Sequence, residues 1–189
     1  MNKKLRTIAI IAAVFLVITM PIIGGYNKMV SLEQKVNVTE GNIDTQLQRR
    51  SDLIPNLVST VKGYASQEKD IFIKVAEARA KLAGAKTVPD KAQADSELGS
   101  AVSRLLVIVE KYPDLKSSQN FRDLTVALEG TENRISTARL DYNTNVGDYN
   151  YTILHFPSNI LAKVFGFDKK PLYKASESAK VVPKVDFTK

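Results

Sequence analysis

The sequence of 189 residues has no cysteine, no tryptophan and only one histidine. Without cysteine, the chain cannot form a disulfide, a thiolate zinc site, a thiol nucleophile or a cysteine-linked lipid anchor. A single histidine leaves little for metal binding or proton shuttling. These absences exclude most enzyme classes. We therefore predict a non-enzymatic protein with no catalytic residue, no cofactor-binding residue and no metal ligand.

Charge is absent from residues 7–25, the run TIAIIAAVFLVITMPIIGG. As a helix, this run would be about 28 Å long, close to the hydrocarbon core of a bilayer at roughly 30 Å. A cleaved signal peptide is the alternative, but the apolar region is longer than usual and no A-x-A-like cleavage site lies before Tyr26. We therefore predict a retained, single-pass transmembrane helix.

The basic residues around this run indicate its orientation. Lys3, Lys4 and Arg6 precede it, whereas only Lys28 and Lys35 are basic in the first twenty residues that follow. The positive-inside tendency then favours a cytoplasmic N-terminus and a chain that lies mostly outside the cytoplasm, in a bacterial inner membrane. The expected domains are a short tail (1–6), the transmembrane helix (7–25), a helical bundle (26–167) and a basic, mostly irregular tail (168–189).

The formal net charge of +7 is concentrated at the two ends of the chain. Residues 1–6 carry +3 and residues 168–189 carry another +3, whereas residues 7–167 have 18 basic and 17 acidic side chains. A nearly neutral domain argues against nucleic acid as a partner. We expect a lipid bilayer and a protein partner or self-association through helices, and no small-molecule substrate.

Apolar residues after Tyr26 recur with helical spacing, and no stretch alternates as a half-buried strand would. Two interleaved heptad series run for almost sixty residues, and two later stretches repeat at steps of three and four. We therefore predict an all-α fold. The heptad series are Val36, Ile43, Leu57, Tyr64 and Ile71, and Leu47, Ile54, Val61, Val75 and Leu82; the later stretches contain Leu98, Val102, Leu105 and Val109, and Phe121, Leu124, Leu128, Ile135, Ala138, Tyr142, Tyr149 and Ile153.

Pro55 leaves two architectures open. Proline either kinks a long helix or occupies the first turn of a new one, which Ser51 or Asp52 would cap. The unchanged heptad phase favours a kink and three long helices. Length favours a reversal, because segments of roughly 29, 31, 22 and 39 residues can pack as an antiparallel four-helix bundle. A single helix of sixty residues would leave half of its apolar seam uncovered, so the four-helix bundle is preferred.

Polar residues interrupt the predicted apolar seams. A buried charge costs several kcal/mol unless it is paired and hydrogen-bonded. Arg50, or Arg49 beside it, should therefore meet a partner such as Glu132 or Asp141. The network can fix the register of the helices, or it can form a polar site like that of di-iron carboxylate proteins, for which one histidine is too few. The seam positions concerned are Glu40, Arg50, Glu68, Thr131, Asn145 and Thr152.

Three other patterns are weak. Residues 141–152 resemble a calcium loop, but Val146 replaces the required glycine, Thr152 replaces the glutamate, and the helical seam continues through them. Residues 84–87 contain residue types of a phosphate loop but lack its spacing. We interpret them as a turn at the end of a helix. His155 lies where a helix should end, and a structural role is expected there.

Residues 160–167 form a short apolar segment near lysines 163, 169 and 170. In the four-helix arrangement, this segment returns beside Tyr26. It then either caps the open end of the bundle, which is the favoured interpretation, or docks at the membrane interface. The apolar residues are Ile160, Leu161, Val164, Phe165 and Phe167.

Several stretches resemble the LemA family of bacterial membrane-anchored proteins. The longest is IDTQLQRRSDLIPNLV at residues 43–58, with Ser51 where histidine is frequent in the family and Gly41 shortly before it. The resemblance covers nearly the whole chain from Tyr26 to about Phe187. The other stretches are Tyr26–Asn27, Val61–Ala65, Tyr112–Lys116, Asn120–Phe121, Leu128–Ile135, Ala138–Arg139, Tyr142–Asn143, Tyr149–Asn150 and Phe156–Phe167.

The resemblance implies a short N-terminal tail, one membrane helix and an antiparallel four-helix bundle without an established enzymatic activity. It supplies no catalytic residues. It also implies relatives in magnetosome membranes and in envelope-stress settings beside membrane metalloproteases. We therefore expect an interaction or scaffolding module of the cell envelope. The alternatives are an accessory subunit of a membrane protease system and a self-assembling, membrane-shaping oligomer.

Overall fold

The computed structural model describes residues 3–174, and every regular element in that range is helical. The all-α prediction is confirmed. Four helices are long and two are short. They are α1 (Lys3–Tyr64), α2 (Lys69–Gly84), α3 (Val88–Val109), α4 (Pro113–Ser117), α5 (Gln119–Leu154) and α6 (Ser158–Phe165).

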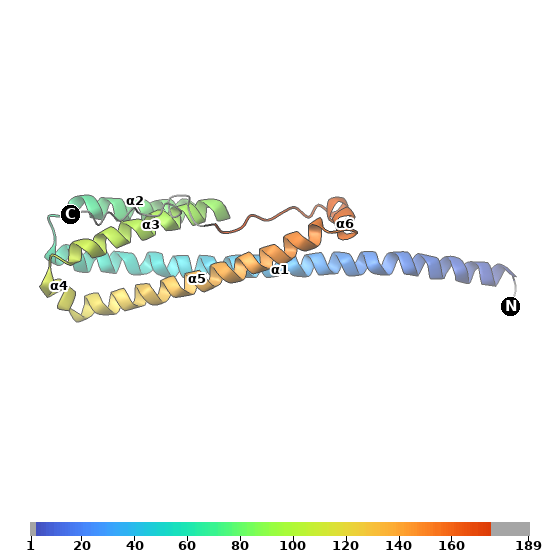
Figure 1. The fold of residues 1–189 in the computed structure, drawn as a ribbon, viewed down its shortest axis with the longest axis horizontal. Coiled ribbons are helices and arrows are strands. Elements are labelled where there is room, and N and C mark those ends of the chain that lie inside the picture. The colour runs from blue at the N-terminus through green and yellow to red at the C-terminus, as the bar shows by residue number, and fades with distance from the viewer. Residues whose placement is uncertain (1–2, 175–189) are drawn as a thin grey trace, which may run out of the picture.

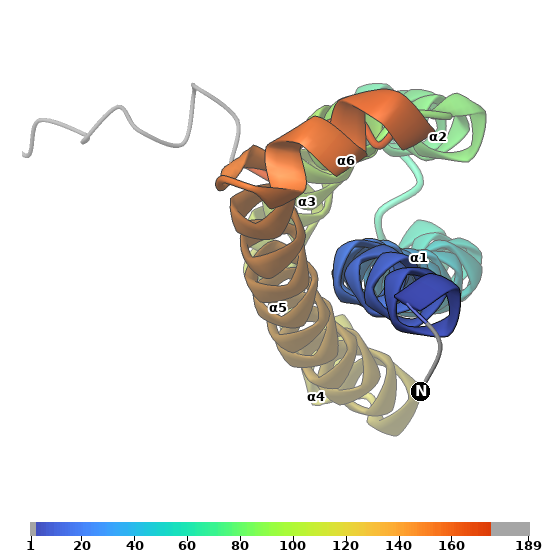
Figure 2. The same cartoon turned by 90° about the vertical axis from the view of Figure 1, so that its right-hand side faces the viewer.

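The helices form an elongated molecule from which the N-terminal part of α1 projects alone (Figure 1). α5 packs along α1 and leads back toward the projecting end. α2 and α3 pack on each other as a hairpin, which lies on one side of the α1 and α5 pair (Figure 2). The short α4 connects α3 to α5 at the far end of the molecule.

The predicted apolar seams form the core. All residues of the two heptad series are buried except Tyr64, which is exposed at the end of α1. The four residues predicted on α3 are buried, and so are those on α5 apart from the partly buried Leu124 and Leu128. α1 therefore buries the seam of its C-terminal part against other helices of the same chain.

The predicted chain reversal at Pro55 is wrong, because α1 continues through this proline for nine more residues. Proline has no N–H, so the carbonyl of Ser51, four residues earlier, loses its helical donor. Arg79 of α2 replaces that donor, since its Nε lies 3.0 Å from Ser51 O and 3.1 Å from Ser51 Oγ. The lost hydrogen bond thus becomes a contact between α1 and α2.

The reversal occurs at residues 65–68 instead, between α1 and α2. Capping side chains begin α3 and α5. Thr87 caps α3 by accepting a hydrogen bond from Asp90 N at 3.3 Å. Ser118 caps α5 in the same way through Phe121 N. Residues 84–87 are a helix end, as predicted.

The uncharged run at residues 7–25 belongs to the exposed, projecting part of α1. This part is long and apolar enough to cross a membrane, and its eighteen-residue apolar window has no buried residue. Large side chains such as Ile11, Phe15 and Val17 are each more than half exposed. A membrane location fits these observations.

α6 lies against α1 at the end of the uncharged run. The ring of Phe165 is 4.9 Å from that of Tyr26, and the ring of Phe167 is 5.7 Å from it. A Cβ at Gly25 would lie 2.9 Å from Leu161 Cδ1, so glycine permits this close approach. The predicted return of residues 160–167 to Tyr26 is confirmed.

Candidate functional site: the Asp95 network and the C-terminal strap

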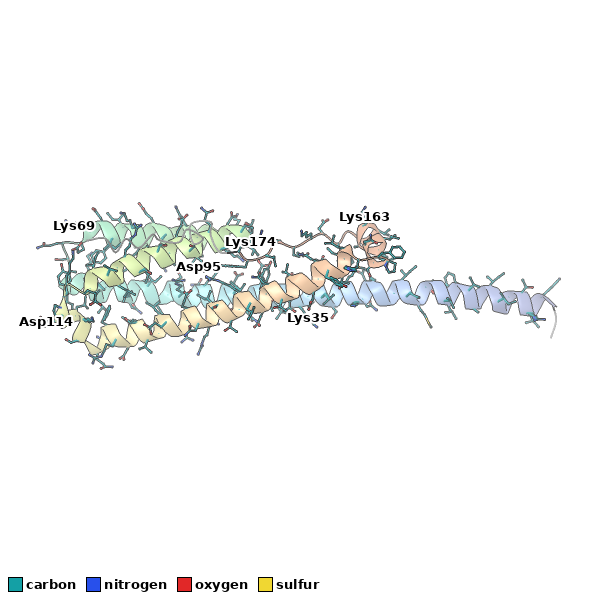
Figure 3. The ribbon with its side chains drawn as sticks, in the orientation of Figure 1. Lys35, Lys69, Asp95, Asp114, Lys163 and Lys174 are labelled. Atoms are coloured by element: carbon teal, nitrogen blue, oxygen red, sulfur yellow. The ribbon has the colours of Figure 1, made fainter. Side chains whose placement is uncertain are left out.

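Asp95 is the most deeply buried charged residue in the described part of the chain. It lies on α3, in the middle of the domain (Figure 3), and its side chain is 0% exposed. An isolated buried carboxylate would cost several kcal/mol, so its partners decide whether the fold tolerates it. Those partners come from α1, from α5 and from the segment after α6.

Arg50 of α1 joins Asp95 to α5. Its Nη1 lies 2.8 Å from Asp95 Oδ1 and 2.8 Å from Glu132 Oε2. Gly99 of α3 leaves room for the guanidinium, because a Cβ there would lie 3.2 Å from Arg50 Nη2. The predicted pairing of Arg50 with Glu132 is confirmed, whereas Arg49 and Asp141 are exposed.

The other oxygen of Asp95 faces α5 and the C-terminal segment. Arg139 Nη2 forms an ion pair with Asp95 Oδ2, and the Tyr173 hydroxyl donates to the same oxygen at 3.2 Å. The Arg139 guanidinium also lies 5.0 Å from the centre of the Tyr173 ring. We call these residues the Asp95 network: Arg50, Asp95, Glu132, Arg139 and Tyr173.

The network is electrically balanced, because two guanidinium groups face two carboxylates. Burial and the neighbouring Asp95 carboxylate raise the pKa of Tyr173, so its hydroxyl stays protonated and can donate. Both Asp95 oxygens are engaged with arginine or tyrosine donors. The arrangement is therefore suited to holding three helices in register rather than to proton transfer or metal binding.

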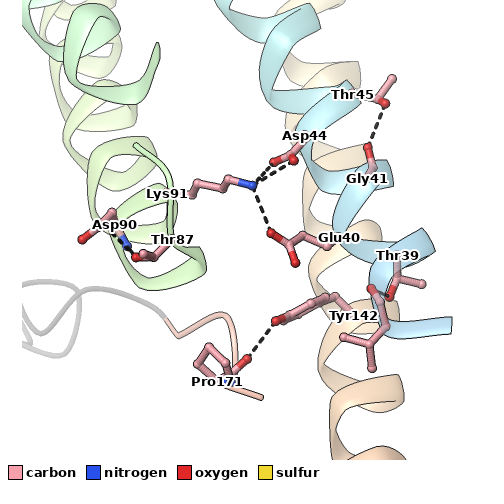
Figure 4. Close-up of polar contacts among 11 residues, drawn as sticks. Thr39, Glu40, Gly41, Asp44, Thr45, Thr87, Asp90, Lys91, Tyr142 and Pro171 are labelled. Atoms are coloured by element: carbon pink, nitrogen blue, oxygen red, sulfur yellow. Dashed lines mark hydrogen bonds and ion pairs between the residues drawn. The ribbon is translucent and has the colours of Figure 1, made fainter. Parts of the chain in front are cut away.

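A second polar contact joins α3 to α1. Lys91 Nζ lies 3.1 Å from Glu40 Oε1 and 2.7 Å from Asp44 Oδ1 (Figure 4). Burial opposes the charged form of Lys91, but the two carboxylates outweigh it and raise the pKa of the ammonium. Glu40, predicted as a polar seam residue, thus meets a cation from the hairpin.

Residues 168–174 run back along α5 as an extended segment, which we call the strap. Asn150 pairs with the backbone of Lys170, donating to its carbonyl and accepting from its N–H at 2.9 Å each. Asn143 pairs in the same way with Tyr173, at 3.0 and 2.8 Å. The two asparagines are seven residues apart, a rise of about 10.5 Å along the helix, and their partners on the strap are three residues apart, roughly 10 Å in an extended chain. The spacing on α5 therefore matches the spacing on the strap.

Two tyrosines beside these asparagines complete the contact. The hydroxyl of Tyr142 donates to Pro171 O at 2.9 Å, and that of Tyr149 donates to Asp168 O at 3.0 Å (Figure 4 shows the first). Burial is the main cause that raises the pKa of each tyrosine to about 12. In the folded chain the hydroxyls therefore remain protonated donors until the pH approaches 12, whereas an unfolded tyrosine ionises near pH 10.

The structure also places other residues that the sequence analysis singled out. The stretch that resembles a calcium loop is a continuous part of α5, with Tyr142 and Val146 buried. Thr131 is buried and donates to Ala127 O at 2.8 Å, within its own helix. His155 follows the last residue of α5, as predicted. Within residues 3–174, no group of three or more His, Cys, Asp or Glu side chains could hold a metal ion.

Sequence reasoning missed Asp95, Arg139 and Tyr173. Asp95 and Arg139 were not on the predicted apolar seams, and Tyr173 lay in the tail that was expected to be irregular. A sequence signal for the strap did exist, because the Tyr-Asn pairs at 142–143 and 149–150 repeat at seven residues. It could have been interpreted as a polar ladder along one face of the helix.

An open cleft of about 930 Å³ lies between the hairpin and the strap. Lys81 and Glu97 form an ion pair of 2.8 Å across α2 and α3 within it. The cleft presents more basic than acidic side chains. They are Lys74, Lys81, Arg104, Lys169, Lys170 and Lys174, with Glu77 and Glu97.

The sequence profile of the LemA family matches residues 39–187, which include α2 to α6, the strap and most of the seam of α1. The chain belongs to the LemA family. It is 26% identical over 178 residues to magnetosome protein MamQ 2 of Paramagnetospirillum magneticum, an alignment that covers 79% of this chain and 64% of that protein.

Two further relatives support the assignment. Magnetosome protein MamQ of Magnetospirillum gryphiswaldense is 26% identical over 170 residues, covering 76% of this chain and 62% of the relative. Protein LemA of Metamycoplasma hominis is 24% identical over 162 residues, covering 84% and 73%. The chain thus spans less than two thirds of the length of the MamQ proteins. The resemblance noted in the sequence is confirmed.

Proposed function

We propose that this chain is a single-pass bacterial membrane protein whose domain is a non-enzymatic interaction and scaffolding module of the cell envelope. One observation carries the proposal: α1 is a single helix that is exposed and apolar at residues 7–25 and becomes a buried core helix after Tyr26. At about 1.5 Å per residue, its 62 residues extend roughly 93 Å. Because the anchor and the domain share one helix, the domain would be held at a fixed height above the membrane and at a fixed angle to it.

The four long helices α1, α2, α3 and α5 are proposed to act as one antiparallel bundle. Two features support this: the seams meet in one core, and the Asp95 network joins α1, α3 and α5. The network suits a scaffold, because its two arginines and two carboxylates are paired with each other across α1, α3 and α5.

The proposed orientation has a cytoplasmic N-terminus and an extracytoplasmic domain in the inner membrane. Lys3, Lys4 and Arg6 before the apolar run support it. Two of the relatives are named magnetosome proteins. Attachment of this chain to a membrane structure of the cell is part of the proposal.

Partner capture in native membranes tests the interaction role. Photocrosslinkers at the exposed Ile73 and Val107 of the hairpin should trap a protein from the same membrane, whereas one at Phe15 should trap mainly lipid. A dominant enzymatic partner would favour the accessory-subunit alternative. Crosslinks only to a second copy would favour self-assembly. The absence of any protein adduct at either hairpin position would contradict the proposal.

A self-assembling oligomer is less well supported by the fold. It gains weight when a long helix leaves its seam without a partner in the same chain. Here the seam from Val36 to Val61 is buried, and α1 packs along α5 of the same chain. Assembly is therefore not needed to cover it.

A further inference from the structure

We propose that α6 is a second membrane contact, seated in the headgroup region of the bilayer that α1 crosses, so that the domain is held at two points. The inference rests on the anchoring part of the proposed function and adds a lipid-binding surface to it. The position of α6, its direction, its exposed side chains and its charge support it.

The position of α6 coincides with the expected membrane surface. Its contacts with α1 include Gly25 and Tyr26, where the uncharged run ends. From Gly25 back to Thr7, α1 rises about 28 Å, which is nearly the thickness of a hydrocarbon core. Tyrosine is also enriched at the interface between membrane and water. If residues 7–25 fill the core, α6 lies at its boundary.

The direction of α6 suits a surface-bound helix. Figure 2 looks along α1 from its N-terminal side and shows α6 lengthwise, whereas Figure 1 shows it foreshortened. α6 therefore runs across the axis of α1. In Figure 1, it lies at the end of the domain from which α1 projects, where only α1 continues further. A membrane crossed by α1 would meet this end of the domain.

The apolar side chains of α6 divide into two neighbouring groups. Leu161 and Phe165 face α1 through the contacts described above. Ile160 and Val164 lie one residue earlier on the helix, about 100° around its axis, and are 55% and 71% exposed. Phe156 lies in the turn between α5 and α6 and is 79% exposed. Ile160 and Val164 thus leave two large apolar side chains uncovered on α6, next to the side chains that contact α1.

The charge around α6 favours a bilayer over a protein surface. Lys163 is exposed on α6 and lies at the same end of the domain (Figure 3). Lys28, two residues after Tyr26, and Lys169, four residues after the end of α6, are exposed as well. An apolar row with lysines at its edge is the pattern by which interfacial helices bind membranes that contain anionic lipid. Gly166, with a φ of 75°, ends α6 and lets the chain turn into the strap.

The absence of tryptophan from the chain makes a direct test possible. Single tryptophans are introduced into the full-length protein at Ile160 and Val164, in separate variants. Each protein is reconstituted into vesicles of equal parts phosphatidylcholine and phosphatidylglycerol, with or without bromine on the acyl chains. Bromine quenches tryptophan fluorescence only where the indole reaches the acyl region.

Two matched positions calibrate the measurement. Phe15→Trp lies within the apolar run and should be strongly quenched if the anchor is inserted. Val126→Trp replaces a side chain that is 67% exposed, similar to Val164, but lies about 42 Å along α5 from the helix end near α6. It should not be quenched.

We expect the quenching at Ile160→Trp and Val164→Trp to be closer to that of Phe15→Trp than to that of Val126→Trp. Adding Ile160→Asp to the Val164→Trp protein should lower the quenching, whereas adding Leu140→Asp, at an exposed leucine of α5, should not. Quenching at both α6 positions that is closer to the Val126→Trp value would overturn the inference. A blue-shifted emission without quenching would also overturn it, because a protein would then cover α6. Loss of quenching at Phe15→Trp would instead contradict the anchor.

Discussion

The two parts of α1 are continuous in backbone and opposite in environment. Residues 7–25 carry apolar side chains on every face, and the large ones that the structure describes are exposed. From Val36 to Val61, apolar residues occupy one seam, which is buried, and the other faces are mostly polar, with Val38 exposed. One helix can therefore suit two solvents. A helix in lipid can be apolar on all faces, whereas a helix in a water-soluble domain needs one apolar stripe that faces the core.

The largest difference between the two parts of α1 is expected when a lysine is introduced into each. Ile43→Lys places a charge in the core and should lower the stability of the domain by more than about 4 kcal/mol, so that most of the protein unfolds. Phe15→Lys should leave the melting temperature of the domain unchanged in detergent and reduce membrane insertion. Circular dichroism and carbonate extraction of membranes measure the two effects. An intact domain with Ile43→Lys would show that this seam is not buried.

Removing an arginine from the Asp95 network should have the next largest effect. Arg50→Met leaves Glu132 without its partner and Asp95 with one ion pair fewer, at a cost of about 3 kcal/mol. Arg49→Met changes an exposed neighbour on the same helix and should stay within about 0.5 kcal/mol of the parent. Chemical denaturation of the full-length protein in detergent measures both. Equal stabilities for the two variants would place Arg50 in solvent.

The strap should loosen without unfolding the helices. Asn143→Ala removes both hydrogen bonds to the Tyr173 backbone and should cost about 2 kcal/mol. Asn133→Ala alters an exposed position of the same helix and should be nearly neutral. Amide hydrogen exchange at residues 168–174 should rise in the first variant only. Unchanged protection in Asn143→Ala would mean that the asparagine does not hold the strap.

The contact between Arg79 and Ser51, whose carbonyl Pro55 leaves without a helical donor, predicts a smaller effect on stability. In the parent protein, Arg79→Ala should cost about 1 kcal/mol, because Ser51 O loses its donor. Pro55→Ala restores a helical N–H for that carbonyl, so the same Arg79→Ala change should then cost less. A double-mutant cycle on denaturation midpoints measures the difference. Additive effects would show that the proline and the arginine act independently.

Sequence periodicity predicted most of the core, because a buried helical face must repeat at three and four residues. The unbroken heptad phase also favoured a helix that continues through Pro55, as α1 does, whereas the argument from helix lengths placed a reversal there wrongly. The reason is that Arg79, from a helix far along the chain, satisfies the carbonyl that proline leaves free, and no local rule contains that contact. Asp95 was missed for a similar reason, since its two arginines lie 45 and 44 residues away in sequence. Pairing with Glu132 could be predicted, because an arginine in an apolar seam requires a carboxylate.

We propose that α1 crosses the membrane once and carries the domain on the side opposite its basic N-terminal residues. Because the chain has no cysteine, single cysteines at Leu5 and Val126 can be labelled with a membrane-impermeant maleimide. In intact cells, or in cells whose outer layer alone has been made permeable, Val126→Cys should be labelled, and Leu5→Cys should react only after the inner membrane is opened. Labelling of both positions from the same side would contradict it.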